Sequence, residues 1–230
     1  MVSELKSRKL KSADSELVNS DGKNRYDLES NPVINFVHLL LELDKTITLK
    51  CSICASSDSS RTIGYLRCFF QFLEISGHGV PWISIPLALM CYSDDQWLNE
   101  LLLNLLAGIF LDLLVSFILK AAVRRPRPPV NQNDMFFAVS VDNKFSFPSG
   151  HCTRVGMLAY FFIANLNLTM FQMALYLLWT IGIAASRLCL GRHYISDVTC
   201  GILIGLLQGM FIQYSWIPLD NLYYLKTYIT

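Results

Sequence analysis

Charged residues are scarce in this sequence. Only 16% of the 230 residues are Asp, Glu, Lys or Arg, whereas 53% are hydrophobic, and the mean hydropathy is +0.38. This composition is too apolar for a typical soluble domain and indicates a protein that crosses a membrane several times. The formal net charge of +1 says little by itself about partners, and we expect membrane lipids rather than nucleic acid.

The usual patterns of metal sites and disulfides are also missing. The seven cysteines show no disulfide spacing, and the single C-x-x-C pair, Cys51 and Cys54, is not followed by a second pair at zinc-site distance. There is no H-x-x-x-H pair and no D-x-D-type site, so we expect neither a metal nor another cofactor. The amino terminus has no apolar h-region, which predicts that no signal peptide is cleaved.

Composition divides the chain into four parts. Residues 1–31 are rich in Ser, Lys, Asp and Glu and are predicted to be a disordered tail. Residues 32–60 are apolar but interrupted by charges, which favours an amphipathic segment lying on the membrane surface. Residues 61–220 are predicted to form the membrane domain, and residues 221–230 a short tail.

The apolar runs predict an all-α transmembrane bundle with about five crossings. The predicted crossings lie within 61–92 and at 98–119, 151–168, 171–185 and 195–212. Residues 61–92 are interpreted as one crossing, because two would need helices shorter than the ~20 residues that a bilayer normally requires. Asn104 and Asp112 interrupt the second crossing and should face the bundle interior.

Three polar clusters flank these runs: 120–128 (KAAVRRPRP), 147–151 (FPSGH) and 186–197 (SRLCLGRHYISD). Charge at the edge of a membrane is unfavourable and needs a reason. One reason is that these residues are interfacial and extend toward the headgroups. Loop parity, however, places the ends of the second and fourth crossings and the starts of the third and fifth on one face, which brings all three clusters together.

The residue types in the clusters suit phosphate chemistry. Cleaving a phosphate ester needs positive donors, a nucleophile and an acid for the leaving oxygen. The candidate donors are Lys120, Arg127, Arg187 and the helix start at Ser149-Gly150. Two histidines, His151 and His193, remain for the other two tasks. If the chain is helical from Tyr194, Asp197 lies one turn from His193 and can hold one imidazole nitrogen, which leaves the other as a nucleophile.

Together the clusters read K-x6-RP, PSGH and SR-x5-H-x3-D. This order resembles the tripartite signature of the type 2 phosphatidic acid phosphatase superfamily, which also includes vanadium haloperoxidases. The resemblance implies a helical bundle in which His193 attacks phosphorus to form a phosphohistidine, Asp197 orients it, and His151 protonates the leaving group and later activates water. It also implies that no metal is needed and that the phosphate is held by Lys120, Arg127, Ser149, Gly150 and Arg187.

Four stretches are similar to the animal polyisoprenoid diphosphate phosphatases within that superfamily: 74–82 (EISGHGVPW), 131–135 (NQNDM), 145–151 (FSFPSGH) and 191–193 (GRH). This similarity implies hydrolysis of presqualene, farnesyl or geranylgeranyl diphosphate, extending to their monophosphates, in the endoplasmic reticulum and nuclear envelope. The alternatives are a broader lipid phosphatase that acts on phosphatidate or sphingosine 1-phosphate, and a catalytically silent membrane scaffold.

Other charged residues carry less weight. Arg124 and Arg125 occupy free positions of the first cluster, where a second phosphate, lipid headgroups or surface anchoring are equally good interpretations. Arg192 precedes His193 and is not expected to be catalytic. Arg154 is interpreted as structural, paired with Asp197 or Asp142. The unpaired histidines His38 and His78 are also interpreted as structural or interfacial.

Overall fold

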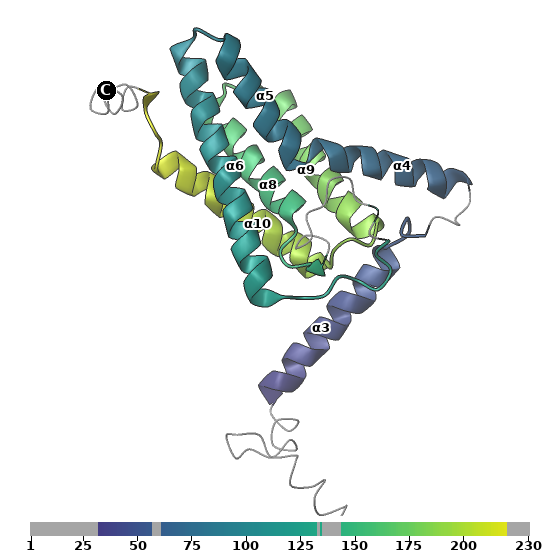
Figure 1. The fold of residues 1–230 in the computed structure, drawn as a ribbon. Coiled ribbons are helices and arrows are strands. Elements are labelled where there is room, and N and C mark those ends of the chain that lie inside the picture. Colours follow the sequence, from purple (N-terminus) through teal and green to yellow (C-terminus); the bar gives the residue numbers. More distant parts are fainter. Residues whose placement is uncertain (1–31, 57–60, 133, 135–143, 220–230) are drawn as a thin grey trace, which may run out of the picture. The chain divides into compact units, whose positions relative to one another are not determined.

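The structure is a computed structural model that describes residues 32–56, 61–132, 134 and 144–219. The chain divides into two compact units, residues 1–46 and 47–230. The larger unit holds the helices of the bundle (Figure 1): α4 (Arg61–Ser76), α5 (Gly79–Tyr92), α6 (Gln96–Val123), α8 (Gly150–Asn165), α9 (Met170–Cys189) and α10 (Ile195–Tyr214). The described part of the chain contains no strand, which confirms the predicted all-α fold.

Helix α3 (Pro32–Cys51) begins with a proline, whose fixed φ and missing N–H suit the first turn of a helix. Its apolar side chains are exposed, Val33 by 67% and Phe36 by 60%. An exposed apolar helix of this kind is typical of a membrane surface, and that location stays a prediction. The last turn belongs to the larger unit, where the Thr48 hydroxyl accepts a hydrogen bond of 3.1 Å from the Ile195 N–H.

The region predicted as a single crossing, residues 61–92, instead forms two helices. The break falls at Gly77-His78, where the His78 Nδ1 accepts a hydrogen bond from the Val80 N–H and caps α5. α5 has 14 residues, which is short for a bilayer, and α4 buries the charged side chains of Arg67 and Glu74. The sequence marks this break with Gly77-His78-Gly79, but the expected length of a crossing favoured a single helix.

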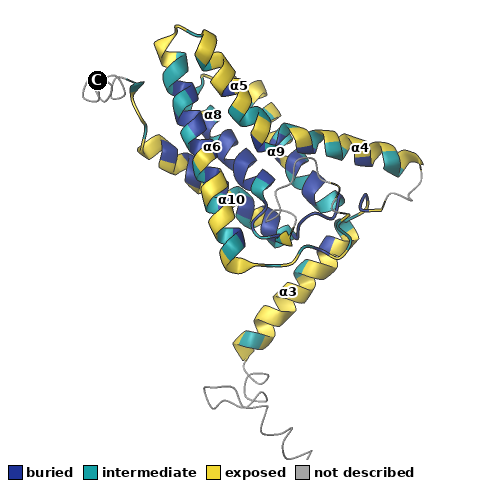
Figure 2. Ribbon diagram, viewed as in Figure 1, coloured by how far each residue is buried: buried dark blue, intermediate teal, exposed yellow. Residues whose placement is uncertain are grey.

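The remaining helices lie close to their predicted limits. By length and hydropathy, three of the described helices are suited to span a bilayer: α6, α9 and α10. Helix α8 has 16 residues and is the most buried of the bundle, with ten of its residues buried. Figure 2 shows that burial concentrates on α8, whereas the outward faces of α5 and α6 are exposed. The total of about five crossings stays a prediction.

Helices α8 and α10 pack backbone against backbone. Gly201, Gly205 and Gly209 recur every fourth residue and therefore lie on one face of α10. A Cβ at Gly205 would lie 2.0 Å from the carbonyl oxygen of Thr153, so only glycine fits this contact. Because the contact extends to the helix starts, the Ser149 N–H donates to the Asp197 carbonyl oxygen at 3.2 Å. The second and third polar clusters are thereby joined.

The polar residues of α6 behave as the sequence predicts. Asn104 is 1% exposed and Asp112 is fully buried, so both face the bundle interior. Asp112 pairs with Arg154 of α8 at 2.9 Å. Of the two predicted partners of Arg154, Asp197 pairs with Arg125 instead, and Asp142 lies outside the described residues. The reason is geometric, since Arg154 is one turn into α8 and reaches across to the middle of α6.

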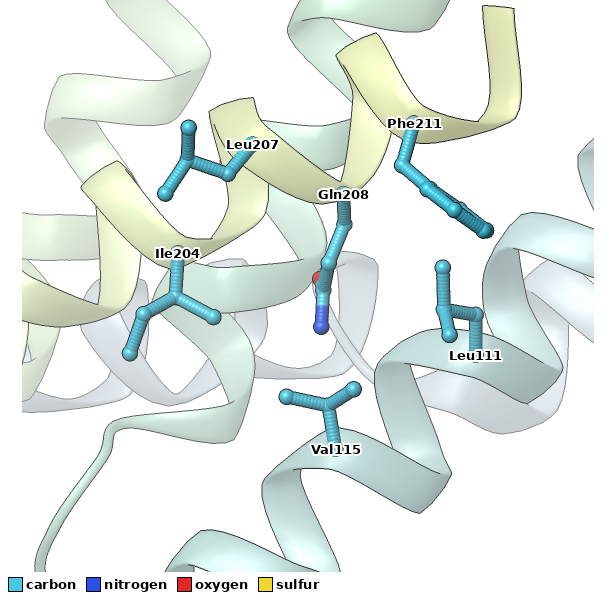
Figure 3. Close-up of a pocket in the computed structure, with 6 residues that line it drawn as sticks. All are labelled: Leu111, Val115, Ile204, Leu207, Gln208 and Phe211. Carbon is cyan, nitrogen blue, oxygen red and sulfur yellow. The ribbon is translucent and has the colours of Figure 1, made fainter. Parts of the chain in front are cut away.

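A groove of about 300 Å³ lies between α6 and α10 on the outside of the bundle. Figure 3 shows Gln208 in its centre, pointing from α10 toward Val115 of α6. Gln208 is 5% exposed, and neither oxygen nor nitrogen of its amide has a protein partner. The other lining residues are apolar: Leu111, Val115, Ile204, Leu207 and Phe211.

Candidate active site

The three polar clusters meet at one end of the bundle, as loop parity predicts. The ends of α6 and α9 and the starts of α8 and α10 come together there (Figure 1). Lys120, near the end of α6, donates to the carbonyl oxygen of Pro148 at 2.7 Å, just before α8. Arg127 donates to the carbonyl oxygen of Arg192 at 3.1 Å, in the turn between α9 and α10.

His193 lies in the turn before α10 and is 2% exposed. Its Nδ1 is 2.7 Å from the carbonyl oxygen of Ser146. A carbonyl oxygen can only accept a hydrogen bond, so Nδ1 carries the proton and Nε2 presents its lone pair. Burial lowers the pKa of His193 well below its usual range, and the nearby charges of Arg127, Lys120 and Arg187 lower it further. The ring is therefore neutral at pH 7, as a nucleophile must be.

Asp197 lies near His193 without a direct hydrogen bond to it, and its orienting role stays a prediction. Its Oδ2 is 3.9 Å from the His193 Nδ1, which is beyond hydrogen-bond distance. Instead, Oδ2 accepts the Tyr194 N–H at 2.9 Å, and Oδ1 pairs with Arg125 at 2.7 Å. Asp197 thus fixes the first turn of α10, which carries His193 at its start. The direct hydrogen bond is instead the one that His193 Nδ1 donates to the Ser146 carbonyl oxygen, and a backbone acceptor leaves no signal in a sequence.

Several polar atoms at this end of the bundle are buried without a protein partner. Among them are the Ser149 Oγ, the His151 Nε2, the Arg187 Nη2 and the Arg192 Nε. All but the last belong to residues that the sequence assigns to phosphate binding or catalysis. Leaving a buried polar group unpaired is unfavourable, so atoms of this kind mark a site built for a ligand. A hydroxyl, an imidazole and a guanidinium can all donate to an oxyanion.

The other predicted phosphate-binding residues lie at helix ends or in the loops beside them. Gly150 is the first residue of α8, so its N–H belongs to the positive end of that helix. Lys120 is 3% exposed and also donates to the Phe145 carbonyl oxygen at 3.4 Å. Arg127 lies close enough to His193 for its charge to act on that ring. The predicted set is therefore gathered at one end of the bundle.

A chain of alternating charges runs through this region, and no local sequence pattern predicts it. Arg187 Nη1 is 2.9 Å from Glu74 Oε1, and Arg192 Nη2 is 3.3 Å from Glu74 Oε2. Arg192 Nη1 forms an ion pair with Asp134 at 2.5 Å, and Asp134 forms a second ion pair with Arg67, also at 2.5 Å. Burial alone would raise the pKa of Asp134, but Arg192 and Arg67 hold it below its usual value. Glu74 lies inside a stretch quoted for the family resemblance, but its partners are far away in sequence.

Three charged or titratable residues that the sequence does not assign to the site make specific contacts in the structure. Arg125 lies 3.8 Å above the ring of Tyr194 and also donates to Ser196 at 2.7 Å, so it is engaged within the protein rather than facing a second phosphate. The ring of His78 lies 6.0 Å from that of His151, measured between centroids. Arg124 ends α6 in a left-handed conformation and donates to the Ala121 carbonyl oxygen at 2.8 Å.

Within the residues that the structure describes, no three His, Cys, Asp or Glu side chains gather in a way that could hold a metal ion. The charge in the candidate site comes from arginine and lysine. These side chains can neutralise phosphoryl oxygens directly, and arginine does so with two parallel donors.

Sequence comparison connects this arrangement to known proteins. A sequence model of the PAP2 superfamily matches residues 101–218. A probable lipid phosphate phosphatase beta from Arabidopsis thaliana is 33% identical over 139 residues, covering 50% of this chain and 65% of the plant protein. Phosphatidylglycerophosphatase B from Bacillus subtilis is 31% identical over 149 residues, covering 61% of this chain and 69% of that protein.

A third relative, decaprenylphosphoryl-5-phosphoribose phosphatase from Mycobacterium tuberculosis, is 32% identical over 109 residues, covering 46% of this chain and 56% of that protein. The chain therefore spans under two thirds of the length of the plant and mycobacterial relatives.

The fold is similar to two crystal structures, each 22% identical in sequence and each covering 76% of this chain. One is Aquifex aeolicus LpxE, with a TM-score of 0.52 and 94% of its chain covered. The other is a transmembrane PAP2 type phosphatidylglycerolphosphate phosphatase from Bacillus subtilis, with a TM-score of 0.55 and 85% of its chain covered. These likenesses support the fold of an integral membrane bundle.

Proposed function

Because this chain belongs to the PAP2 superfamily, we propose that it is a metal-independent membrane phosphatase that hydrolyses isoprenoid diphosphates. Presqualene, farnesyl and geranylgeranyl diphosphate are the proposed substrates, with their monophosphates as an extension. The observation that carries the proposal is the group of unpartnered buried atoms on Ser149, His151 and Arg187, which is suited to receive a phosphoryl group.

In the proposed first step, the lone pair on Nε2 of His193 attacks the terminal phosphorus. The bond from phosphorus to the bridging oxygen breaks, and that oxygen takes the Nε2 proton of His151, which enters this step as the imidazolium and leaves it neutral. The isoprenoid monophosphate leaves, and the phosphoryl group stays on His193. The donors of Lys120, Arg127, Arg187, Ser149 and the Gly150 N–H stabilise the charge on the three phosphoryl oxygens.

In the second step, the neutral His151 takes a proton from water while the water oxygen attacks phosphorus. The phosphorus–nitrogen bond breaks, its electron pair returns to Nε2 of His193, and inorganic phosphate is released. The hydrogen bond from Nδ1 to the Ser146 carbonyl oxygen keeps the His193 ring in one orientation through both steps.

Three observations favour an isoprenoid substrate. The mycobacterial relative is named for a decaprenyl-linked phosphate, and the quoted stretches resemble isoprenoid diphosphate phosphatases. The groove between α6 and α10 also suits a hydrocarbon chain, because Ile204 lies seven residues after Asp197, or ~10 Å along the helix. A lipid headgroup at the helix ends would place its chain beside this groove. From the resemblance to polyisoprenoid diphosphate phosphatases, we also propose that the protein resides in the endoplasmic reticulum and nuclear envelope.

A second candidate is a broader lipid phosphatase that acts on phosphatidate or sphingosine 1-phosphate. It is favoured by the plant and Bacillus relatives, which are named for a lipid phosphate and a phosphatidylglycerophosphate. Both candidates use the same site residues and the same two steps, so they differ only in what surrounds the lipid chain.

The test is phosphate release by detergent-purified protein in EDTA, on farnesyl diphosphate, presqualene diphosphate and phosphatidic acid. The proposal expects turnover that EDTA does not inhibit and that is fastest on the isoprenoid diphosphates. Faster turnover of phosphatidic acid would support the broader phosphatase instead. Loss of turnover in EDTA would overturn the metal-independent mechanism, and no release from any substrate by folded protein would support a silent scaffold.

Vanadate tests the phosphate site separately. It forms a five-coordinate mimic of the transferring phosphoryl group, and such mimics bind more tightly than substrates. We expect vanadate to inhibit turnover competitively and to raise the temperature at which the protein unfolds. Full turnover in a large excess of vanadate would contradict the assigned donors.

A further inference from the structure

Glu74 lies in α4, outside the three polar clusters of the superfamily signature, and yet it is part of the site. Its side chain is 2% exposed, and its two oxygens contact two different fully buried arginines. Oε1 is 2.9 Å from Arg187 Nη1, and Oε2 is 3.3 Å from Arg192 Nη2. One carboxylate thus joins α4 to the end of α9 and to the turn that precedes His193.

The contact with Arg187 leaves one part of the guanidinium available. Nη1 is held by Glu74, and Nε contacts the Ser186 hydroxyl at 3.3 Å, whereas Nη2 is buried without a protein partner. Because the guanidinium is planar and rigid, fixing two of its nitrogens fixes the direction of the third. Glu74 therefore determines where the unpartnered N–H groups of Arg187 point.

The position of Glu74 is itself fixed by the turn between α4 and α5. A Cβ at Gly77 would lie 3.3 Å from the His151 ring and 3.2 Å from Ile183, so this backbone lies directly against the candidate acid. Arg154 of α8 donates to the Gly77 carbonyl oxygen at 3.2 Å. The carboxylate is thus attached to the same framework as His151, and little movement of one relative to the other is possible.

We propose that Glu74 is a positioning residue that aims Arg187 at the phosphoryl group, while its second oxygen restrains Arg192. The inference rests on the proposed phosphatase function. Without the carboxylate, the Arg187 guanidinium can rotate, and Arg192 loses one of its acidic partners. Glu74 does not touch the substrate, and its whole effect passes through the arginines.

The test is Glu74→Gln in purified protein, assayed on whichever of farnesyl diphosphate or phosphatidic acid the wild type hydrolyses faster. The amide of this variant keeps the shape of the carboxylate but not the charge that holds two guanidinium groups. We expect kcat to fall ~10- to 100-fold with KM within about threefold, because aiming matters most in the transition state. Vanadate affinity should fall by a similar factor, and Glu74→Asp should restore part of both.

A double-mutant cycle separates positioning from simple structural support. If Glu74 acts through Arg187, adding Glu74→Gln to Arg187→Ala should lower kcat less than about threefold further. If the two losses multiply, the proposal is wrong. Arg187→Lys provides a second background in case the alanine variant does not fold, and the same non-additivity is expected there.

Glu100→Gln is the matched control, because Glu100 is a partly buried glutamate at the other end of α6 and outside the site. Equal effects of the two substitutions on kcat would overturn the proposal. Vanadate-induced stabilisation needs no substrate, so it also tests Glu74 if the wild type hydrolyses nothing. In that case the proposed function fails, while the vanadate cycle still decides whether Glu74 positions Arg187.

Discussion

The two ends of the bundle use buried polar groups in opposite ways. At the start of α6, Glu100 accepts hydrogen bonds from the Trp216 Nε1 at 2.6 Å and the Leu219 N–H at 3.0 Å. Asn104 is likewise bonded through both atoms of its amide, to the Ile217 N–H and carbonyl oxygen. At the other end, Glu74 contacts two arginines, and each of these keeps an unpartnered nitrogen.

This difference distinguishes buried polar groups that stabilise the fold from buried polar groups that are suited to bind a ligand. Glu100 and Asn104 attach the segment after α10 to α6, and their hydrogen-bonding capacity is used up within the protein. At the candidate site, four cations lie near His193: Lys120, Arg127, Arg187 and Arg192. Arg187 and Arg192 each keep one buried nitrogen without a protein partner. A buried excess of donors is unfavourable for stability alone, and it becomes favourable when an anion binds.

The largest effect is expected from His193→Ala, which removes the proposed nucleophile. Turnover should fall by at least ~10³-fold, since removal of a nucleophile leaves only binding and charge stabilisation. The fold should persist, because the side chain makes one hydrogen bond to a loop carbonyl. Phosphate release and trapping of the phosphoenzyme in acid measure this, with thermal unfolding as the control for folding. Retained turnover would exclude His193 as the nucleophile.

Asp197 provides the next test, because it has no direct hydrogen bond to the residue that it is predicted to orient. Asp197→Asn removes the ion pair with Arg125 and disturbs the first turn of α10. We expect a fall in kcat of ~10²-fold, the usual result of displacing a catalytic group by about 1 Å. Arg125→Gln should cause a comparable loss, and the two should not be additive. If Arg125→Gln leaves kcat unchanged, Asp197 acts directly on His193, as the sequence predicts.

The link between helices α8 and α10 is tested by Gly205→Ala. The added methyl group would lie 2.0 Å from a backbone oxygen that cannot move aside, so the helices must separate. We expect a loss of about 3 kcal/mol in stability and lower turnover from the folded fraction. The matched control is Gly64→Ala in α4, where nothing lies within 4 Å of the added carbon. A similar loss in both variants would contradict the role of the close contact.

Much of this arrangement was predictable from the sequence, for identifiable physical reasons. Apolar runs define where helices can lie, so the limits of α6, α9 and α10 came within a few residues. Because successive crossings alternate in direction, their order alone predicts that the three polar clusters lie on one membrane face, and helix packing is not needed for that prediction. The same logic placed Asn104 and Asp112 in the interior, because a polar side chain facing lipid is unfavourable.

The contacts that were missed all join residues distant in sequence or involve the backbone. Glu74 and Arg187 are 113 positions apart, and no local pattern pairs them. The carbonyl oxygen of Ser146 is common to every residue, so its contact with His193 has no signature. The break between α4 and α5 had a signal in Gly77-His78-Gly79, but the expected length of a crossing outweighed it.

The smallest effect is expected from Glu100→Gln, which probes the end of the bundle where polar groups are satisfied. The amide keeps one acceptor oxygen for Trp216 or Leu219 and loses the other, and both partners are neutral. We expect a loss of about 1 kcal/mol in stability, typical of one hydrogen bond, and a kcat within twofold of wild type. Urea unfolding and phosphate release measure the two quantities separately. Because Lys120 lies twenty residues further along α6, or ~30 Å away, a clear fall in kcat at unchanged stability would mean that the two ends are coupled.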